Sequence, residues 1–219
     1  MAASALATGT VTVAGDGYET KVVDFGRSPD LTIVLSGSDK WPTSLAGGAT
    51  NTQPSDDIET WQTTFLKESG AVPTDLVFTN SSWRAFRLDT TIKDNAITFP
   101  ALSPFGNQIN AGAQIAKGAV YKGRWGNFDL WLYNDWFIDP LDNVEKPMIA
   151  DGAVIMSGAD LMGTRAFGVI LDPAFNYGPL AFAPKSEVKF DPAQRIILMQ
   201  SAPLVIPSRV NASLCATVV

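Results

Sequence analysis

The sequence predicts a mixed α+β protein with one long helix and a large share of β-sheet. Two patterns support this prediction. Apolar residues recur at helical spacing over a long stretch at residues 56–69, and from residue 92 onward short β-rich runs alternate with proline and glycine breaks. The 219 residues, 46% of them hydrophobic, are enough for one large domain or two small interlocked ones.

The N-terminal segment, residues 8–36, is predicted to be β structure. Two short β-rich runs flank Gly15, Asp16 and Gly17, which is typical of a hairpin turn, and a third strand follows proline at residues 31–35. A hairpin of two strands is only marginally stable in water. The hairpin has no evident partner in the sequence, so we expect its tip, from Gly15 to Tyr18, to contact another subunit.

A polar loop rich in Gly, Ser, Thr, Asn and Pro follows at residues 37–54. Trp41 lies within it, and an aromatic side chain in a loop usually anchors that loop. We expect Trp41 to contact a neighbouring subunit as well.

The clearest helix is predicted at residues 56–69. Acidic residues at its start complement the helix dipole, and Gly70 ends it. Trp61 and Phe65 fall on its apolar face, so we expect both side chains in the core. A strand at residues 75–78 and a short helix near Asn80 should follow.

The second half of the chain is predicted to contribute mainly strands. Trp131 and Trp136 belong to its most aromatic stretch, and we expect both to pack in or near the core. The expected strands are residues 119–121, 127–133, 152–156, 165–171, 195–200 and 214–219.

Composition argues against several classes of function. The chain has no histidine, which removes Ser-His-Asp triads and His-ligated zinc. Cys215 is the single cysteine and lies in an apolar run, so we expect a buried, inert thiol. The net charge is −6 with no run of basic residues, which disfavours sequence-reading contact with nucleic acid. We expect no catalytic, cofactor or metal site.

Membrane association is not indicated either. No segment reaches the roughly 18 apolar residues of a membrane span. Residues 1–6 lack the basic and apolar regions of a signal peptide.

Acidic and aromatic residues alternate at residues 128–139, which leaves one alternative of a different class. Paired carboxylates near aromatic rings are what a glycosidase needs, so a carbohydrate-active or sugar-binding domain would use Asp129 and Asp135. The spacing also allows a structural role, because Asp129 and Trp131 share one face of a strand and Asp135 flanks a turn.

Five stretches of the chain, in order, resemble the phage major capsid protein E family, the coat proteins of lambda-like phages. The motif GRWGNFDLWLYNDW at residues 123–136 and the C-terminal segment 200–219 are the most specific. The other three stretches are residues 57–75, 146–154 and 165–170. The resemblance covers roughly residues 5–219 and implies a structural protein, not an enzyme.

The resemblance implies a Hong Kong 97-like capsid fold. Residues 1–50 would form the extended β-hairpin loop and its connection, and residues 51–104 the peripheral domain with its long spine helix. Residues 105–185 would form the axial domain, and residues 186–219 the strands that return to the peripheral domain.

The implied function is that of a shell subunit of an icosahedral tailed-phage or prophage capsid. Copies would self-assemble into hexamers and pentamers in the host cytoplasm and enclose double-stranded DNA in the virion. Decoration, scaffold and portal proteins would be further partners.

Family members carry a substantial region before the matched part, so the chain resembles an N-terminally truncated member. Two alternatives stay open beside the capsid: an encapsulin-like compartment that stores protein, and a decoy or inhibitor of capsid assembly.

Overall fold

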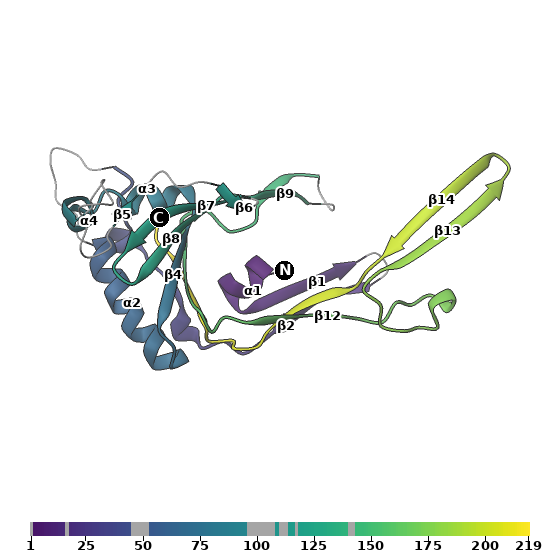
Figure 1. The fold of residues 1–219 in the computed structure, drawn as a ribbon, viewed down its shortest axis with the longest axis horizontal. Helices are drawn as coiled ribbons and strands as arrows, with labels where there is room; N and C mark the ends of the chain where they lie inside the picture. Colours follow the sequence, from purple (N-terminus) through teal and green to yellow (C-terminus); the bar gives the residue numbers. More distant parts are fainter. Residues whose placement is uncertain are drawn as a thin grey trace.

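The computed structural model describes residues 2–15, 18–44, 53–95, 108–109, 114–116, 118–139 and 143–219. The molecule is elongated, with a body at one end and a long two-stranded projection at the other (Figure 1). We call the projection, residues 163–207, the arm. The body contains the hydrophobic core and the four α-helices of the described residues.

The body is built on one mixed sheet that has eight strands among the described residues. Their order is β3-β16-β11-β4-β8-β7-β5, and β6 also pairs with β7. Two pairs, β16–β3 and β4–β8, are parallel, and the others are antiparallel. The strands are β3 (Thr32–Val34), β4 (Pro73–Phe78), β5 (Gln108–Ile109), β6 (Gln114–Ala116), β7 (Ala119–Trp125), β8 (Phe128–Tyr133), β11 (Ala153–Gly158) and β16 (Ser213–Thr217).

The helix α2 (Gln53–Ser69) covers one face of this sheet (Figure 1). Its apolar stripe includes Trp61 and Phe65, which are 4% and 0% exposed and belong to the main core cluster with Leu76 and Phe78 of β4. Helical spacing therefore aims these side chains at the sheet, as the sequence predicts. The remaining helices are α1 (Ala2–Thr8), α3 (Asn80–Phe86) and α4 (Thr90–Asn95), and short 3₁₀ turns occur at η1 (Pro29–Leu31) and η2 (Gly37–Asp39).

Trp41 packs inside its own subunit, contrary to the expectation that it contacts a neighbour. Its side chain is 2% exposed and stacks on Trp61 with a centroid distance of 5.6 Å. Its indole N–H donates a hydrogen bond of 2.7 Å to Asp57. The indole thus anchors the loop to α2, because that helix offers both an aromatic face and a hydrogen-bond acceptor.

Trp131 and Trp136 differ from each other in burial. Leu130 of β8 points into the core, so its neighbour Trp131 lies on the opposite face of the sheet and is partly buried. The indole N–H of Trp131 donates a hydrogen bond of 3.0 Å to Asp75. Trp136 is 50% exposed, contrary to the expectation of core packing. The reason is that β9 (Trp136–Ile138) leaves the main sheet and pairs with β10 (Glu145–Pro147) in a separate ribbon.

The N-terminal hairpin is held by its own subunit at its base. Strands β1 (Thr10–Gly15) and β2 (Tyr18–Asp24) pair antiparallel, and α1 packs between β1 and β16. Val11 is 0% exposed, and Arg27 donates 2.7 Å hydrogen bonds to the backbone of α1. At the tip, Gly15 pairs with Tyr18, while Asp16 and Gly17 lie outside the described residues. The contact expected of this tip stays a prediction.

The main sheet draws strands from all four segments that the resemblance delimits. Strand β3 comes from residues 1–50, β4 from 51–104, β7, β8 and β11 from 105–185, and β16 from 186–219. Each of the four segments therefore contributes at least one strand to the same sheet.

Candidate subunit-contact surface

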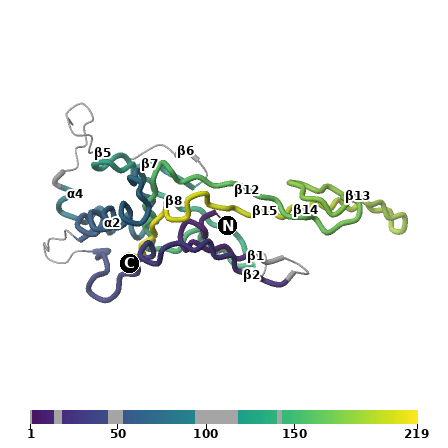
Figure 2. The backbone as a smooth tube through the Cα atoms, turned by 90° about the horizontal axis from the view of Figure 1, so that it is seen from below, coloured from purple at the N-terminus to yellow at the C-terminus, as the bar shows by residue number. Residues whose placement is uncertain are grey.

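The arm consists of two antiparallel ribbons joined end to end. Strand β12 (Gly163–Phe167) leaves the body and pairs with the returning β15 (Pro203–Pro207). Farther out, β13 (Ala183–Phe190) pairs with β14 (Ala193–Gln200), which we call the distal hairpin. Both views show this hairpin extending well away from the sheet and its helices (Figures 1 and 2).

The distal hairpin has an unbroken register. Its opposed pairs run from Ala183 and Gln200 at the base to Phe190 and Ala193 at the tip. Asp191 and Pro192 connect the strands, and proline cannot donate to a ladder, which suits a turn. The hairpin is therefore a regular ribbon whose ends are fixed by local sequence.

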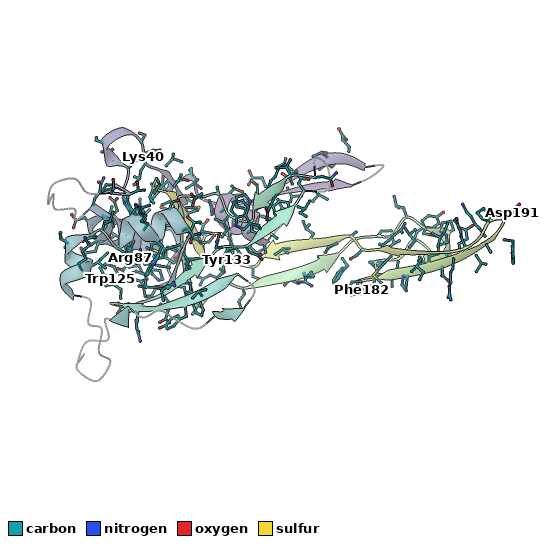
Figure 3. All side chains as sticks on the ribbon, turned by 90° about the horizontal axis from the view of Figure 1, so that it is seen from above. Lys40, Arg87, Trp125, Tyr133, Phe182 and Asp191 are labelled. Carbon is teal, nitrogen blue, oxygen red and sulfur yellow. The ribbon has the colours of Figure 1, made fainter. Side chains whose placement is uncertain are left out.

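No part of the chain that the structure describes covers this ribbon. Every residue from 184 to 199 is exposed. In Figure 3, Phe182 marks the base of the hairpin and Asp191 its tip, far from the labelled residues of the body. A two-stranded hairpin on its own is only marginally stable in water, so a packing partner on either face would stabilise this ribbon.

The uncovered side chains include many large apolar ones. Those on and beside the hairpin range from 40% exposed at Ile196 to 90% at Phe190. The set comprises Phe182, Val188, Phe190, Ile196, Ile197, Leu198 and Met199. Such a concentration of exposed apolar surface typically marks a site of protein association.

An ion pair fixes the base of the hairpin. The ammonium group of Lys185 donates a hydrogen bond of 2.9 Å to the carboxylate of Asp172. Asp172 precedes the 3₁₀ turn η4 (Pro173–Phe175) and also accepts a hydrogen bond of 2.8 Å from the backbone N–H of Ala174. The Ala174 hydrogen bond, followed by the lysine, lowers the pKa of Asp172. The carboxylate is thereby kept ionised and ties the loop to the first strand of the hairpin.

A second exposed apolar surface lies on the body, on the β9–β10 ribbon. Trp136 and Ile138 are 50% and 69% exposed, and Phe137, Val144 and Met148 add to the surface. The ion pair between Lys146 and Asp139, at 2.5 Å, links the two sides of this ribbon.

A shallow hollow of about 130 Å³ adjoins the β9–β10 ribbon. It is lined by Thr79, Asn80, Tyr133, Asp135, Trp136 and Asp151, among others. Burial by itself would raise the pKa of Asp151, but hydrogen bonds from Ser81, Gly152 and Thr79 outweigh it and lower the pKa. A glycosidase acid needs a raised pKa, so Asp151 is not suited to that role.

The two carboxylates proposed for glycan chemistry serve local hydrogen bonds. Asp129 accepts a hydrogen bond of 3.0 Å from the hydroxyl of Tyr121. Burial and this hydrogen bond raise the pKa of Tyr121. Asp135 accepts 3.0 Å from the backbone N–H of Trp136. These contacts favour the structural interpretation of the acidic and aromatic stretch.

Other chemistry finds little support in the described part of the chain. No group of three or more His, Cys, Asp or Glu side chains there is placed to hold a metal ion. No helix among the described residues is long and apolar enough to cross a membrane. Cys215 is 7% exposed, and burial raises the pKa of its thiol.

Sequence reasoning missed the first strand of the distal hairpin and so missed the hairpin itself. Residues 195–200 were expected as a strand, but β13 carries Lys185, Glu187 and Lys189 and does not look apolar. The signal that could have found it is period two: Val188 and Phe190 alternate with charged residues and lead into the Asp191-Pro192 break.

Comparison with known proteins gives consistent matches. The sequence pattern of the family described as phage major capsid protein E matches residues 1–218. The major capsid proteins of Escherichia phage lambda and Escherichia phage N15 are each 30% identical to the chain over 209 residues. Each match covers 94% of this chain and 58% of the relative, so the chain spans less than two thirds of these curated relatives.

A solved structure shows the same fold. The putative capsid protein of a prophage from E. coli CFT073 superposes with a TM-score of 0.78 at 19% identity. The likeness covers 100% of this chain and 61% of that one.

Proposed function

The chain belongs to the phage major capsid protein E family, and from this premise we propose that it is a structural subunit of a tailed-phage or prophage capsid shell. The observation that carries the proposal is the uncovered distal hairpin. Its residues from 184 to 199 are all exposed, and several are large and apolar. A shell subunit needs surface of this kind, because each copy is completed by its neighbours.

The proposed shell is an icosahedral capsid of Hong Kong 97-like fold, made of hexamers and pentamers. Individual contacts can be weak in such a shell, because closure multiplies them. In this assignment α2 is the spine helix of the peripheral domain, and residues 105–185 supply much of the axial domain. Decoration, scaffold and portal proteins are the further partners that the proposal implies.

The cargo of the proposed shell is double-stranded DNA held by confinement. A subunit of net charge −6 does not supply the clustered cations that adhesion to phosphates requires. An encapsulin-like compartment would hold protein in place of DNA, so the content of purified particles distinguishes these two functions. We propose no catalytic role.

The distal hairpin can be shortened to test the proposal. Ser186 and Ile197 oppose each other directly, so residues 187–196 can be replaced by Asn-Gly, which favours a tight hairpin turn. We expect the wild-type chain to form large particles or rings in sedimentation velocity, and the shortened chain to stay monomeric with an unchanged melting temperature. Equal assembly of both chains, or a monomeric wild type, would contradict the proposal.

A further inference from the structure

The two faces of the distal hairpin differ in chemistry. Side chains of directly opposed residues project to the same face of an antiparallel ribbon, so the register sorts them. One face, which we call the apolar face, carries Pro184, Ser186, Val188, Phe190, Ala193, Arg195, Ile197 and Met199. The opposite face carries Lys185, Glu187, Lys189, Gln194, Ile196 and Leu198.

The apolar face is the more exposed of the two for its large apolar residues. Phe190, Ile197 and Met199 are 90%, 72% and 65% exposed, whereas Ile196 and Leu198 on the opposite face are 40% and 46% exposed. Arg195 is the one charged residue of the apolar face and is directly opposite Val188. This face is therefore an apolar surface with a single positive charge.

The β9–β10 ribbon of the body presents the complementary surface. Glu145 opposes Ile138, and Pro147 opposes Trp136, so these four side chains share one face. Ile138 and Trp136 are 69% and 50% exposed, and Glu145 is exposed as well. The ribbon face is thus apolar with a single negative charge.

The charges of the surrounding segments follow the same division. Residues 134–151 contain five acids and one lysine, a net charge of −4, whereas residues 183–200 have a net charge of +1. Neither Arg195 nor Glu145 forms an ion pair within the described part of its own subunit. Both charges are therefore available to a second copy of the chain.

We infer that the apolar face of the distal hairpin of one copy docks on the β9–β10 ribbon of the next copy. The inference rests on the proposed function and specifies which surfaces of the two subunits meet. The contact is head-to-tail, since the two patches differ, and a head-to-tail contact repeated by rotation closes a ring. Arg195 of one copy lies near Glu145 of the next, within a rim of apolar side chains.

Adjacent isoleucines on the same strand provide a matched test of the face. Ile197→Asp places a carboxylate on the apolar face, and Ile196→Asp places the same group on the opposite face. We expect Ile197→Asp to raise the concentration needed for half assembly in sedimentation velocity at least about tenfold, and Ile196→Asp to change it far less. Equal effects of the two substitutions would overturn the face assignment.

A charge reversal tests the pairing of the two surfaces. Arg195→Glu and Glu145→Arg should each weaken assembly, because each places like charges in the contact. The double variant Arg195→Glu/Glu145→Arg restores opposite charges between neighbours, so we expect it to assemble more readily than either single variant. A double variant whose losses simply add would overturn the pairing.

The wild type separates failure of this inference from failure of the proposed function. Suppose that the wild type assembles, that Ile197→Asp and Ile196→Asp weaken assembly equally, and that the double charge variant assembles no better than the single ones. This result overturns the docking geometry and leaves the shell function in place. A wild type that stays monomeric at every concentration overturns both.

Discussion

At the scale of single residues, burial decides which of the tryptophans act within the subunit. Trp41 is 2% exposed and joins a loop to α2 by stacking and by a hydrogen bond to Asp57. Trp136 is 50% exposed on the β9–β10 ribbon. Sequence analysis assigned Trp41 to a subunit contact and Trp136 to the core. The burial of the two side chains is the reverse, because it depends on packing between distant segments that spacing alone does not report.

The two residues should therefore respond differently to truncation. Trp41→Ala should lower the free energy of unfolding by about 3–5 kcal/mol, the usual cost of removing a buried large aromatic side chain. Trp136→Ala should lower it by about 1 kcal/mol or less and should weaken assembly instead. Denaturant unfolding and sedimentation of both variants check this, and an unchanged stability of Trp41→Ala would show that its burial contributes nothing.

Asp89 is a buried residue that sequence reasoning did not single out. It is 0% exposed. Its carboxylate accepts a hydrogen bond of 2.8 Å from the backbone N–H of Ser55 and one of 2.7 Å from the backbone N–H of Thr91. It thereby caps the first turns of α2 and α4 at once. Its partners are 34 and 2 residues away in the chain, and the distant one is visible only in the folded structure.

Asp89→Ala should destabilise the body by about 1–4 kcal/mol, since each lost helix cap costs about 0.5–2 kcal/mol. The two caps use different carboxylate oxygens, so Asp89→Asn keeps an acceptor for one helix and loses the other. It should therefore cost less than Asp89→Ala. Thermal unfolding of the two variants gives the comparison. If the alanine and asparagine variants had the same melting temperature, the capping role would be refuted.

At the scale of elements, the predictability of each segment depended on whether its pattern faces its own core. The predicted helix at residues 56–69 corresponds to α2 (Gln53–Ser69), because its apolar stripe packs on the sheet. Strand β16 (Ser213–Thr217) was likewise visible as an apolar run. The distal hairpin was not foreseen, since β13 is rich in charged residues and no described part of the chain packs on the hairpin. The helix α1 (Ala2–Thr8) was missed because it carries small residues.

The base of the distal hairpin should be sensitive to acid. The pKa of Asp172 is lowered first by the Ala174 N–H and then by Lys185. A lowered pKa in the folded state stabilises the loop above the ordinary aspartate value of about 4, and this contribution is lost as the pH falls through the lowered value. The backbone amide of Ala174 should accordingly be better protected from hydrogen exchange at neutral pH than in acid, after correction for the intrinsic pH dependence of exchange.

Removal of the lysine tests the order of these causes. In Lys185→Met the pKa of Asp172 should rise only part of the way to its ordinary value, because the Ala174 hydrogen bond remains. An NMR titration of the Asp172 carboxyl carbon measures the pKa in both chains. Asp160→Asn serves as the control, because its ion pair with Arg209 is exposed on the body and should not affect Asp172. A complete return to the ordinary value in Lys185→Met would assign the shift to the lysine alone.

At the scale of the whole molecule, the chain consists of a body that contains the main hydrophobic core and an arm that contributes no residue to that core. The main core cluster contains residues from Leu31 to Val218 and none from the distal hairpin. The extended shape in Figure 2 leaves the hairpin beyond the reach of its own body. The sequence predicts an extended contact element at residues 8–36, and the structure adds a second extended element, the distal hairpin. The base of the N-terminal hairpin is held by α1 and Arg27, and the contact predicted for its tip stays a prediction.

The central claim is that copies of this chain complete one another through the distal hairpin. Electron cryo-microscopy of the purified chain at high concentration tests it most directly. We predict closed shells, or rings of five or six copies, in which β13 and β14 of each copy lie on the β9–β10 ribbon of a neighbour. Particles in which the hairpin projects freely into solvent, or a field of single subunits, would contradict the claim.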